Sequence, residues 1–169
     1  PVDSGVAILT QSSNIAINLT MQQRGLPIAY MVTCGNMAQT KQAEIALALL
    51  DDPRVTAIGL HIEGFSDTHA WHRLAIAAAE KGIPLVALKV GRSEQAQRAT
   101  VSHTASLAGG DAGAAALLRR LGIARLRDLP SFLEALKVLH VNGRLDVSLL
   151  SSISCSGGEA SLAADTAHG

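Results

Sequence analysis

TAIGLHI at residues 56–62, with the helical pattern DTHAWHRLAIAAAEKG at 67–82 and a second apolar run, PLVALKV at 84–90, indicates a strand, a helix and another strand in succession. Both runs are nearly continuous in apolar residues, as expected of strands that are covered on both faces. The segment between them has apolar residues three or four apart and ends at a glycine. This order predicts a βαβ unit with two parallel strands and a right-handed crossover.

The same alternation continues on both sides of this unit. VAILT (6–10) and IAYMVT (28–33) are two further expected strands. Helices are expected at residues 15–25, 41–53, 111–122 and 130–143, the last with Pro130 in its first turn and Gly143 at its end. The fold class is therefore α/β, with a parallel, doubly wound sheet and helices on both faces.

The last segment, residues 144–169, has a pattern that is distinct from the first domain. DVSLLSSISCSGGEASLAADTAHG (146–169) predicts a strand, a Ser-Gly-Gly turn and a helix. We interpret this segment as the first strand and helix of a following α/β domain, after a first domain at 1–143. The chain starts with PVDSG, which is neither an initiator methionine nor a signal peptide, so we expect it to be a piece of a longer protein.

Composition excludes several classes of function. The 169 residues include 14 basic and 14 acidic side chains, and only one Trp, one Tyr and two Phe, which argues against a nucleic-acid partner. No apolar stretch is long enough to cross a bilayer. Cys34 and Cys155 lie far apart without metal-like spacing, which favours a reducing compartment and a cytoplasmic location.

Polar residues follow each expected strand. The junctions are TQSSN (10–14), TCGNM (33–37), IEGFSD (62–67) and KVGRSE (89–94). In an open parallel sheet, ligands bind beyond the carboxyl ends of the strands. Small and hydroxyl residues let backbone N–H groups converge there, and the helix N-termini that follow favour an anion. Phosphate is the simplest occupant.

One histidine lies in an unusual context, the stretch VSHTASLAGGDAG at 101–113. A neutral imidazole, oriented by a carboxylate on one nitrogen, can attack phosphorus with the other. Glu63, at the end of a strand and before Gly64, is the best-placed acid for His103. Asp67 is the weaker candidate because it is well placed to cap a helix.

The ordered motifs TQSS, CGN, IEG, LKVGRS and SHTASLAGGD resemble the succinyl-CoA-ligase-like flavodoxin domain of the NDP-forming acyl-CoA synthetases, over about residues 5–142. The resemblance implies a flavodoxin-like three-layer fold. In that family, acyl-CoA and phosphate give an acyl phosphate, which phosphorylates a histidine, and the phosphohistidine then phosphorylates a nucleoside diphosphate. His103 matches the phosphorylated histidine and Glu63 the glutamate that supports it. The implied phosphate-binding residues are Ser12, Ser13, Asn14, Gly35 and Asn36, and the implied loop-supporting residues are Lys89, Arg92, Ser102 and Thr104.

The resemblance also implies cofactors and partners. Phosphate would bind in this domain, and the full enzyme would use CoA and ADP or ATP with Mg²⁺. A CoA-binding domain would precede residue 1, an ATP-grasp domain or subunit would complete the reaction, and the fragment would be inactive alone, with a homo- or hetero-oligomer left open. The sequence departs from the family at Ser13-Asn14 in the S-Q-S-G turn and at KQAEIA (41–46).

Other interpretations remain open. A non-catalytic phosphate- or CoA-sensing module could use the same fold. A serine hydrolase could use Ser156 in SCSGG with Asp165 and His168, although the first glycine of the nucleophile motif is missing. A metal site drawn from His61, His69, His72 and Glu63, a reactive Cys34 thiol, and a flavin sandwiched by Trp71 and Tyr30 are weaker, and we expect no metal site here.

Overall fold

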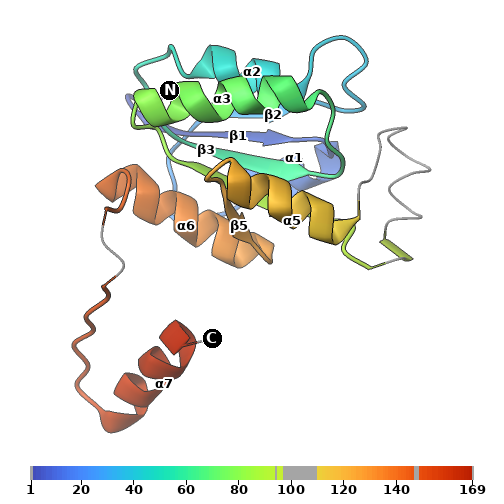
Figure 1. Cartoon of the computed structure of the whole chain (residues 1–169). Helices are drawn as coiled ribbons and strands as arrows, with labels where there is room; N and C mark the ends of the chain where they lie inside the picture. The colour runs from blue at the N-terminus through green and yellow to red at the C-terminus, as the bar shows by residue number, and fades with distance from the viewer. Residues whose placement is uncertain (1, 94, 97–109, 147–148, 169) are drawn as a thin grey trace.

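A computed structural model describes residues 2–93, 95–96, 110–146 and 149–168 (Figure 1). The strands are β1 (Gly5–Thr10), β2 (Ile28–Thr33), β3 (Val55–Ile62), β4 (Leu85–Lys89) and β5 (Ala124–Leu126). The helices are α1 (Ser13–Thr20), α2 (Gln42–Leu49), α3 (Thr68–Glu80), α5 (Asp111–Arg120), α6 (Leu129–Asn142) and α7 (Gly157–His168). No helix in these ranges is both long and apolar enough to cross a membrane.

The five described strands form one sheet in the order β2-β1-β3-β4-β5, and every pairing is parallel. The chain passes from β1 to one side, at β2, and then to the other side of β1, at β3. Such a reversal is the topological switch point of a doubly wound sheet. The predicted parallel α/β architecture is confirmed, and its strand order is that of the flavodoxin-like fold.

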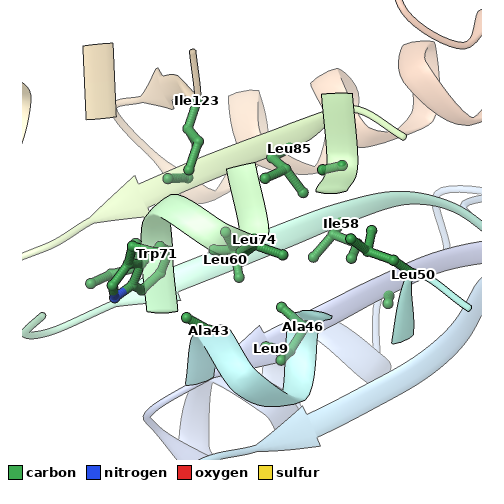
Figure 2. Packing of buried hydrophobic residues seen from close by; sticks show 14 of the residues in the cluster. Leu9, Ala43, Ala46, Leu50, Ile58, Leu60, Trp71, Leu74, Leu85 and Ile123 are labelled. Carbon is green, nitrogen blue, oxygen red and sulfur yellow. The ribbon is translucent and has the colours of Figure 1, made fainter. Parts of the chain in front are cut away.

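Two apolar layers cover the sheet. On one face, Ala43 and Ala46 of α2, Trp71 and Leu74 of α3, and Leu118 of α5 are buried against residues such as Leu9, Ile58 and Leu60. Figure 2 shows this cluster, with Trp71 and Leu74 pointing at the strands. On the other face, Leu19 of α1 and Phe132, Leu133 and Leu136 of α6 cover Val6, Ile8 and Leu88. Helix, sheet and helix layers therefore make the expected three-layer fold.

Gly59 sets how closely α6 approaches β3. A Cβ atom at this position would lie 2.6 Å from Phe132 Cζ and 2.7 Å from Leu136 Cδ1. Real Cβ atoms do not approach other carbons that closely. The missing side chain therefore lets α6 pack directly on the sheet.

Some elements differ from the sequence-based expectation. Strand β5 was not predicted, because three residues with a central arginine give no periodic signal. Helix α1 ends at Thr20, short of the predicted residue 25. Residues 149–154 form no strand, although α7 follows where a helix was predicted. A strand requires a neighbouring strand for its backbone hydrogen bonds, and none of the described strands pairs with this segment.

Candidate functional site

The polar loops gather at the carboxyl edge of the sheet. The loop after β1 leads into α1 on one face, whereas the loop after β3 leads into α3 on the opposite face. The two loops therefore diverge beside the switch point (Figure 1). His103, Ser102 and Thr104 lie outside the residues that the structure describes.

The turn after β1 places three predicted residues at the start of α1. Ser12 is the N-cap, and its side chain accepts a hydrogen bond from the Ile15 N–H at 3.4 Å. Ser13 and Asn14 are exposed in the first turn, which contains no acidic residue. A helix start with this composition suits an anion, since its free N–H groups carry partial positive charge.

Gln11 connects this turn to the loop after β3. Its Oε1 accepts from the backbone N–H groups of Glu63 at 2.9 Å and Gly64 at 3.0 Å. Its Nε2 donates to the Gly64 carbonyl at 2.9 Å and to Gln42 Oε1 at 3.2 Å. All four hydrogen-bonding positions of this buried amide are therefore used. Gln11 fixes the main chain that carries Glu63.

A second buried amide supports the first. Gln42, at the start of α2, is fully buried, and its Nε2 donates to the carbonyls of Leu9 and His61 at 3.0 Å each. The pair Gln11–Gln42 therefore joins the ends of β1 and β3 to α2. Local sequence patterns gave no sign of this network, because Gln11 and Gln42 are 31 residues apart and Gln42 and His61 are 19 apart.

Glu63 is half-buried and follows the last residue of β3. Its charge acts on Lys89 at the end of β4. Asp67, the weaker candidate for an orienting acid, accepts instead from the backbone N–H groups of His69 and Ala70, at 3.1 and 3.4 Å. Its expected helix-capping role is confirmed.

Lys89 is a buried cation at the base of this edge, only 3% exposed. Its Nζ donates to the Val90 carbonyl. Burial and the nearby Arg125 lower the pKa of Lys89, whereas the carboxylates of Asp111 and Glu63 raise it. The charge of Lys89 therefore lies near charged groups from β5, from α5 and from the loop that follows β3.

The ion pair between Asp111 and Arg125 was not predicted from the sequence. Asp111 opens α5, and its carboxylate accepts two hydrogen bonds from the Arg125 guanidinium in β5. The Arg125 hydrogen bonds hold the pKa of Asp111 below its usual range. Arg92 is exposed and acts electrostatically on the same carboxylate. Val90, Gly91, Arg92, Ser93, Ala96 and Asp111 line a shallow hollow here.

The loop after β2 borders the same edge. Gly35 has a φ of 55°, a conformation that favours glycine, and both Gly35 and Asn36 are exposed. The Cys34 N–H donates to the Thr10 carbonyl at 2.7 Å, which ties this loop to β1. Burial raises the pKa of Cys34 to about 11, so its thiol is protonated and unreactive at neutral pH.

Three alternative interpretations are not supported by the geometry. Ser156 accepts from the Glu159 N–H at 3.2 Å as the cap of α7, the helix that also carries Asp165 and His168. No three His, Cys, Asp or Glu side chains among the described residues are arranged to hold a metal ion. Trp71 is 1% exposed within the core and cannot stack on a flavin.

Comparison with known proteins identifies relatives of this chain. A family model for the succinyl-CoA ligase like flavodoxin domain matches residues 3–139. An ADP-forming acetate–CoA ligase of Methanocaldococcus jannaschii is 29% identical over 168 residues, which cover 98% of this chain and 24% of the relative. The alpha subunit of ADP-forming acetate–CoA ligase I of Pyrococcus furiosus is 31% identical over 123 residues, or 71% of this chain and 26% of that subunit.

A solved structure has the same arrangement of elements. The dinucleotide forming acetyl-coenzyme A synthetase 1 of Ca. Korarchaeum cryptofilum, in complex with phosphate and ADP, superposes with a TM-score of 0.83 and 26% identity. The match covers 98% of this chain and 37% of that chain. The present chain spans about a quarter of the length of the curated relatives named above. The chain therefore belongs to the family of succinyl-CoA-ligase-like flavodoxin domains and is homologous to part of the ADP-forming acetate–CoA ligases.

Proposed function

We propose that this chain is the phosphohistidine-bearing domain of an NDP-forming acyl-CoA synthetase, with His103 as the phosphoryl carrier. The observation that carries the proposal is the Gln11 amide, which joins the Ser12 turn to the main chain of Glu63 and Gly64. Family membership supplies the reaction class. The geometry supports a site with a phosphate turn and an orienting carboxylate held in fixed relation.

The proposed reaction proceeds in three reversible displacements. A phosphate oxygen attacks the acyl-CoA carbonyl, the C–S bond breaks, and acyl phosphate and the CoA thiol result. A ring nitrogen of His103 then attacks phosphorus, the P–O bond to the acyl group breaks, and the carboxylate leaves. Finally, a terminal oxygen of the nucleoside diphosphate attacks phosphorus, the P–N bond breaks, and the triphosphate forms.

The residues of this chain have distinct parts in that scheme. The exposed N–H groups of Ser13 and Asn14, together with the side chains of Ser12, Ser13 and Asn14, hold the phosphate, with Gly35 and Asn36 on the adjoining turn. Glu63 accepts the ring N–H of His103 and stabilises the cationic phosphoimidazole. The remaining proposed residues, Lys89, Arg92, Ser102 and Thr104, support the histidine-bearing segment.

Other partners follow from the same proposal. By the resemblance to that family, CoA binds an upstream domain, and the nucleotide with Mg²⁺ binds an ATP-grasp domain or subunit. We place the boundary between the first domain and the start of a second one between residues 143 and 144. All of Leu149, Leu150, Ile153 and Leu162 are exposed beyond that point, which supports a second domain that would cover them. Two free cysteines are consistent with a cytoplasmic enzyme.

The test is an assay of the full protein with its ATP-grasp partner. ATP, Mg²⁺, CoA and a panel of short carboxylates should give acyl-CoA, ADP and phosphate, and His103→Ala should abolish the reaction. Phosphate binding without turnover by any panel member, in a protein with an intact partner, would contradict the proposal and favour a non-catalytic sensing module.

A further inference from the structure

A buried histidine lies beneath the phosphate turn. His61 of β3 is 2% exposed and pairs in register with Thr10 of β1. Residues in register on neighbouring parallel strands project to the same face of the sheet. Thr10 Oγ1 lies 3.0 Å from His61 Nδ1, and both side chains are buried. Neither residue belongs to the set that the resemblance assigned to phosphate.

Thr10 in turn holds both backbone groups of Ser12. Its Oγ1 accepts from the Ser12 N–H at 3.0 Å and donates to the Ser12 carbonyl at 3.1 Å. A hydroxyl has one proton and two acceptor positions. If His61 donates through Nδ1–H, the Thr10 oxygen accepts two bonds and its own proton remains for the Ser12 carbonyl. This tautomer is the one that satisfies all three contacts at once.

The ring has the protonation state that this arrangement needs. Burial, assisted by the charge of Lys89, lowers the pKa of His61 to about 4, so the imidazole is neutral at pH 7. A neutral ring carries one N–H. Whether Nδ1 or Nε2 carries this proton decides which way the Thr10 hydroxyl points.

We propose that His61 is a positioning residue, which acts through the Thr10 hydroxyl to hold the Ser12 turn in its anion-binding shape. The inference rests on the proposed phosphate site. Ser12 caps α1, so the orientation of its peptide groups fixes the direction of the N–H groups at the start of that helix. His61 need not touch the phosphate for its loss to weaken phosphate binding.

The chain contains a matched control for this pair. Thr56 Oγ1 and His140 Nδ1 are 2.7 Å apart, again between β3 and a partner element, here α6. Thr56 is five residues before His61 on the same strand, about 16 Å away at 3.3 Å per residue. Loss of the Thr56–His140 contact should lower stability without changing the Ser12 turn.

The experiment is a ¹H–¹⁵N NMR titration of the 169-residue chain with inorganic phosphate. His61→Leu should raise the Kd about five- to tenfold, as expected for one buried hydrogen bond. Thr10→Val should raise it at least as much, because it also removes both hydrogen bonds between the Thr10 hydroxyl and Ser12. The double variant should bind no more weakly than Thr10→Val alone, since His61 acts through the Thr10 hydroxyl. His61→Asn should retain most of the affinity, because its amide nitrogen can replace the Nδ1 donor.

The control variants Thr56→Val and His140→Leu should bind phosphate as the original chain does, even where urea unfolding shows a loss of stability. Folded His61→Leu with unchanged phosphate affinity, or an equal loss in both control variants, would overturn the positioning role and leave the proposed function intact. An original chain that binds no phosphate would overturn both. The ring ¹⁵N shifts of His61 should show a protonated Nδ1, and an unprotonated Nδ1 would contradict the assigned hydroxyl orientation.

Discussion

The side-chain amide of Gln11 makes two hydrogen bonds to the backbone of Gly64. Nε2 donates to the Gly64 carbonyl at 2.9 Å, and Oε1 accepts from the Gly64 N–H at 3.0 Å. The two residues are 53 positions apart in the sequence. A buried amide used in this way extends the hydrogen bonding between β1 and β3 past the end of the sheet, and it does so at the switch point where a ligand is expected.

Replacing Gln11 by Leu should destabilise the chain by about 3 kcal/mol. The backbone N–H groups of Glu63 and Gly64 would lose their acceptor inside the protein, and each unsatisfied buried group costs about 1–3 kcal/mol. Urea unfolding of the 169-residue chain measures the change. Gln22→Leu is the control, because Gln22 is exposed just after α1, where its side chain donates to the Asn18 carbonyl and accepts from Arg24 Nε. Equal midpoints for Gln11→Leu and the original chain would contradict the assigned role.

His61 should make stability depend on pH in the acid range. Its pKa is about 4 in the folded chain and about 6.5 when unfolded. Between these values the unfolded state binds more protons, so stability is complete above pH 6.5 and falls as the pH drops toward 4. The loss should reach about 3 kcal/mol.

His61→Asn should lack that part of the pH dependence. Urea unfolding of both proteins at several pH values between 4 and 7.5 gives the two curves. The difference between the two curves gives the contribution of His61 to the pH dependence of stability, because both proteins have the same carboxylates. Parallel curves would show that the ring is not buried in its neutral form.

Gly59 and Gly113 should respond oppositely to alanine. At Gly59 the new Cβ would clash with Phe132 and Leu136, which predicts a loss of about 1–3 kcal/mol. At Gly113, within α5, nothing lies within 4 Å of the position that a Cβ would take, and alanine should stabilise the helix by about 0.5–1 kcal/mol. Thermal unfolding of the two variants tests this, and a stable Gly59→Ala would contradict the close packing of α6 on β3.

Much of the fold was predictable because its signals are local. The apolar runs at 6–10, 28–33, 56–62 and 84–90 all lie within or largely overlap the observed strands. Gly143 ends α6 as predicted, with a φ of 68°. Strand β5 could not be predicted, since its three residues pair with β4 only in the folded sheet.

The site was less accessible to sequence reasoning. The junction loops were correctly identified as the polar edge, and Ser12 and Glu63 lie there, but nothing marked Gln11, Gln42 or Arg125 as their supports. The sequence alone does not tell whether a glutamine is buried or exposed. The hydrogen-bond partners of Gln11 and Gln42 also come from distant parts of the chain. Only the register of β1 with β3 shows that Thr10 lies beside His61.

Glu63→Gln should leave the fold intact but slow phosphorylation of the histidine. Glutamine keeps an oxygen that can accept the ring N–H, yet it lacks the charge that stabilises the cationic phosphoimidazole. The rate should fall on the order of 10²-fold, or a few kcal/mol in the barrier. Rapid-quench measurement of phosphoenzyme formation in the full protein tests this, with Asp67→Asn as the matched carboxylate control. An equal fall in both variants would move the orienting role away from Glu63.

The most direct test of the central proposal is to locate the phosphoryl group. The full protein with its ATP-grasp partner, incubated with radiolabelled ATP and Mg²⁺, should carry a label that is labile to acid and stable to base, as a phosphorus–nitrogen bond requires. Peptide mapping should place it on His103, and His103→Ala should lose it together with turnover. A label that persists undiminished in folded His103→Ala, or that maps to another residue, would contradict the account.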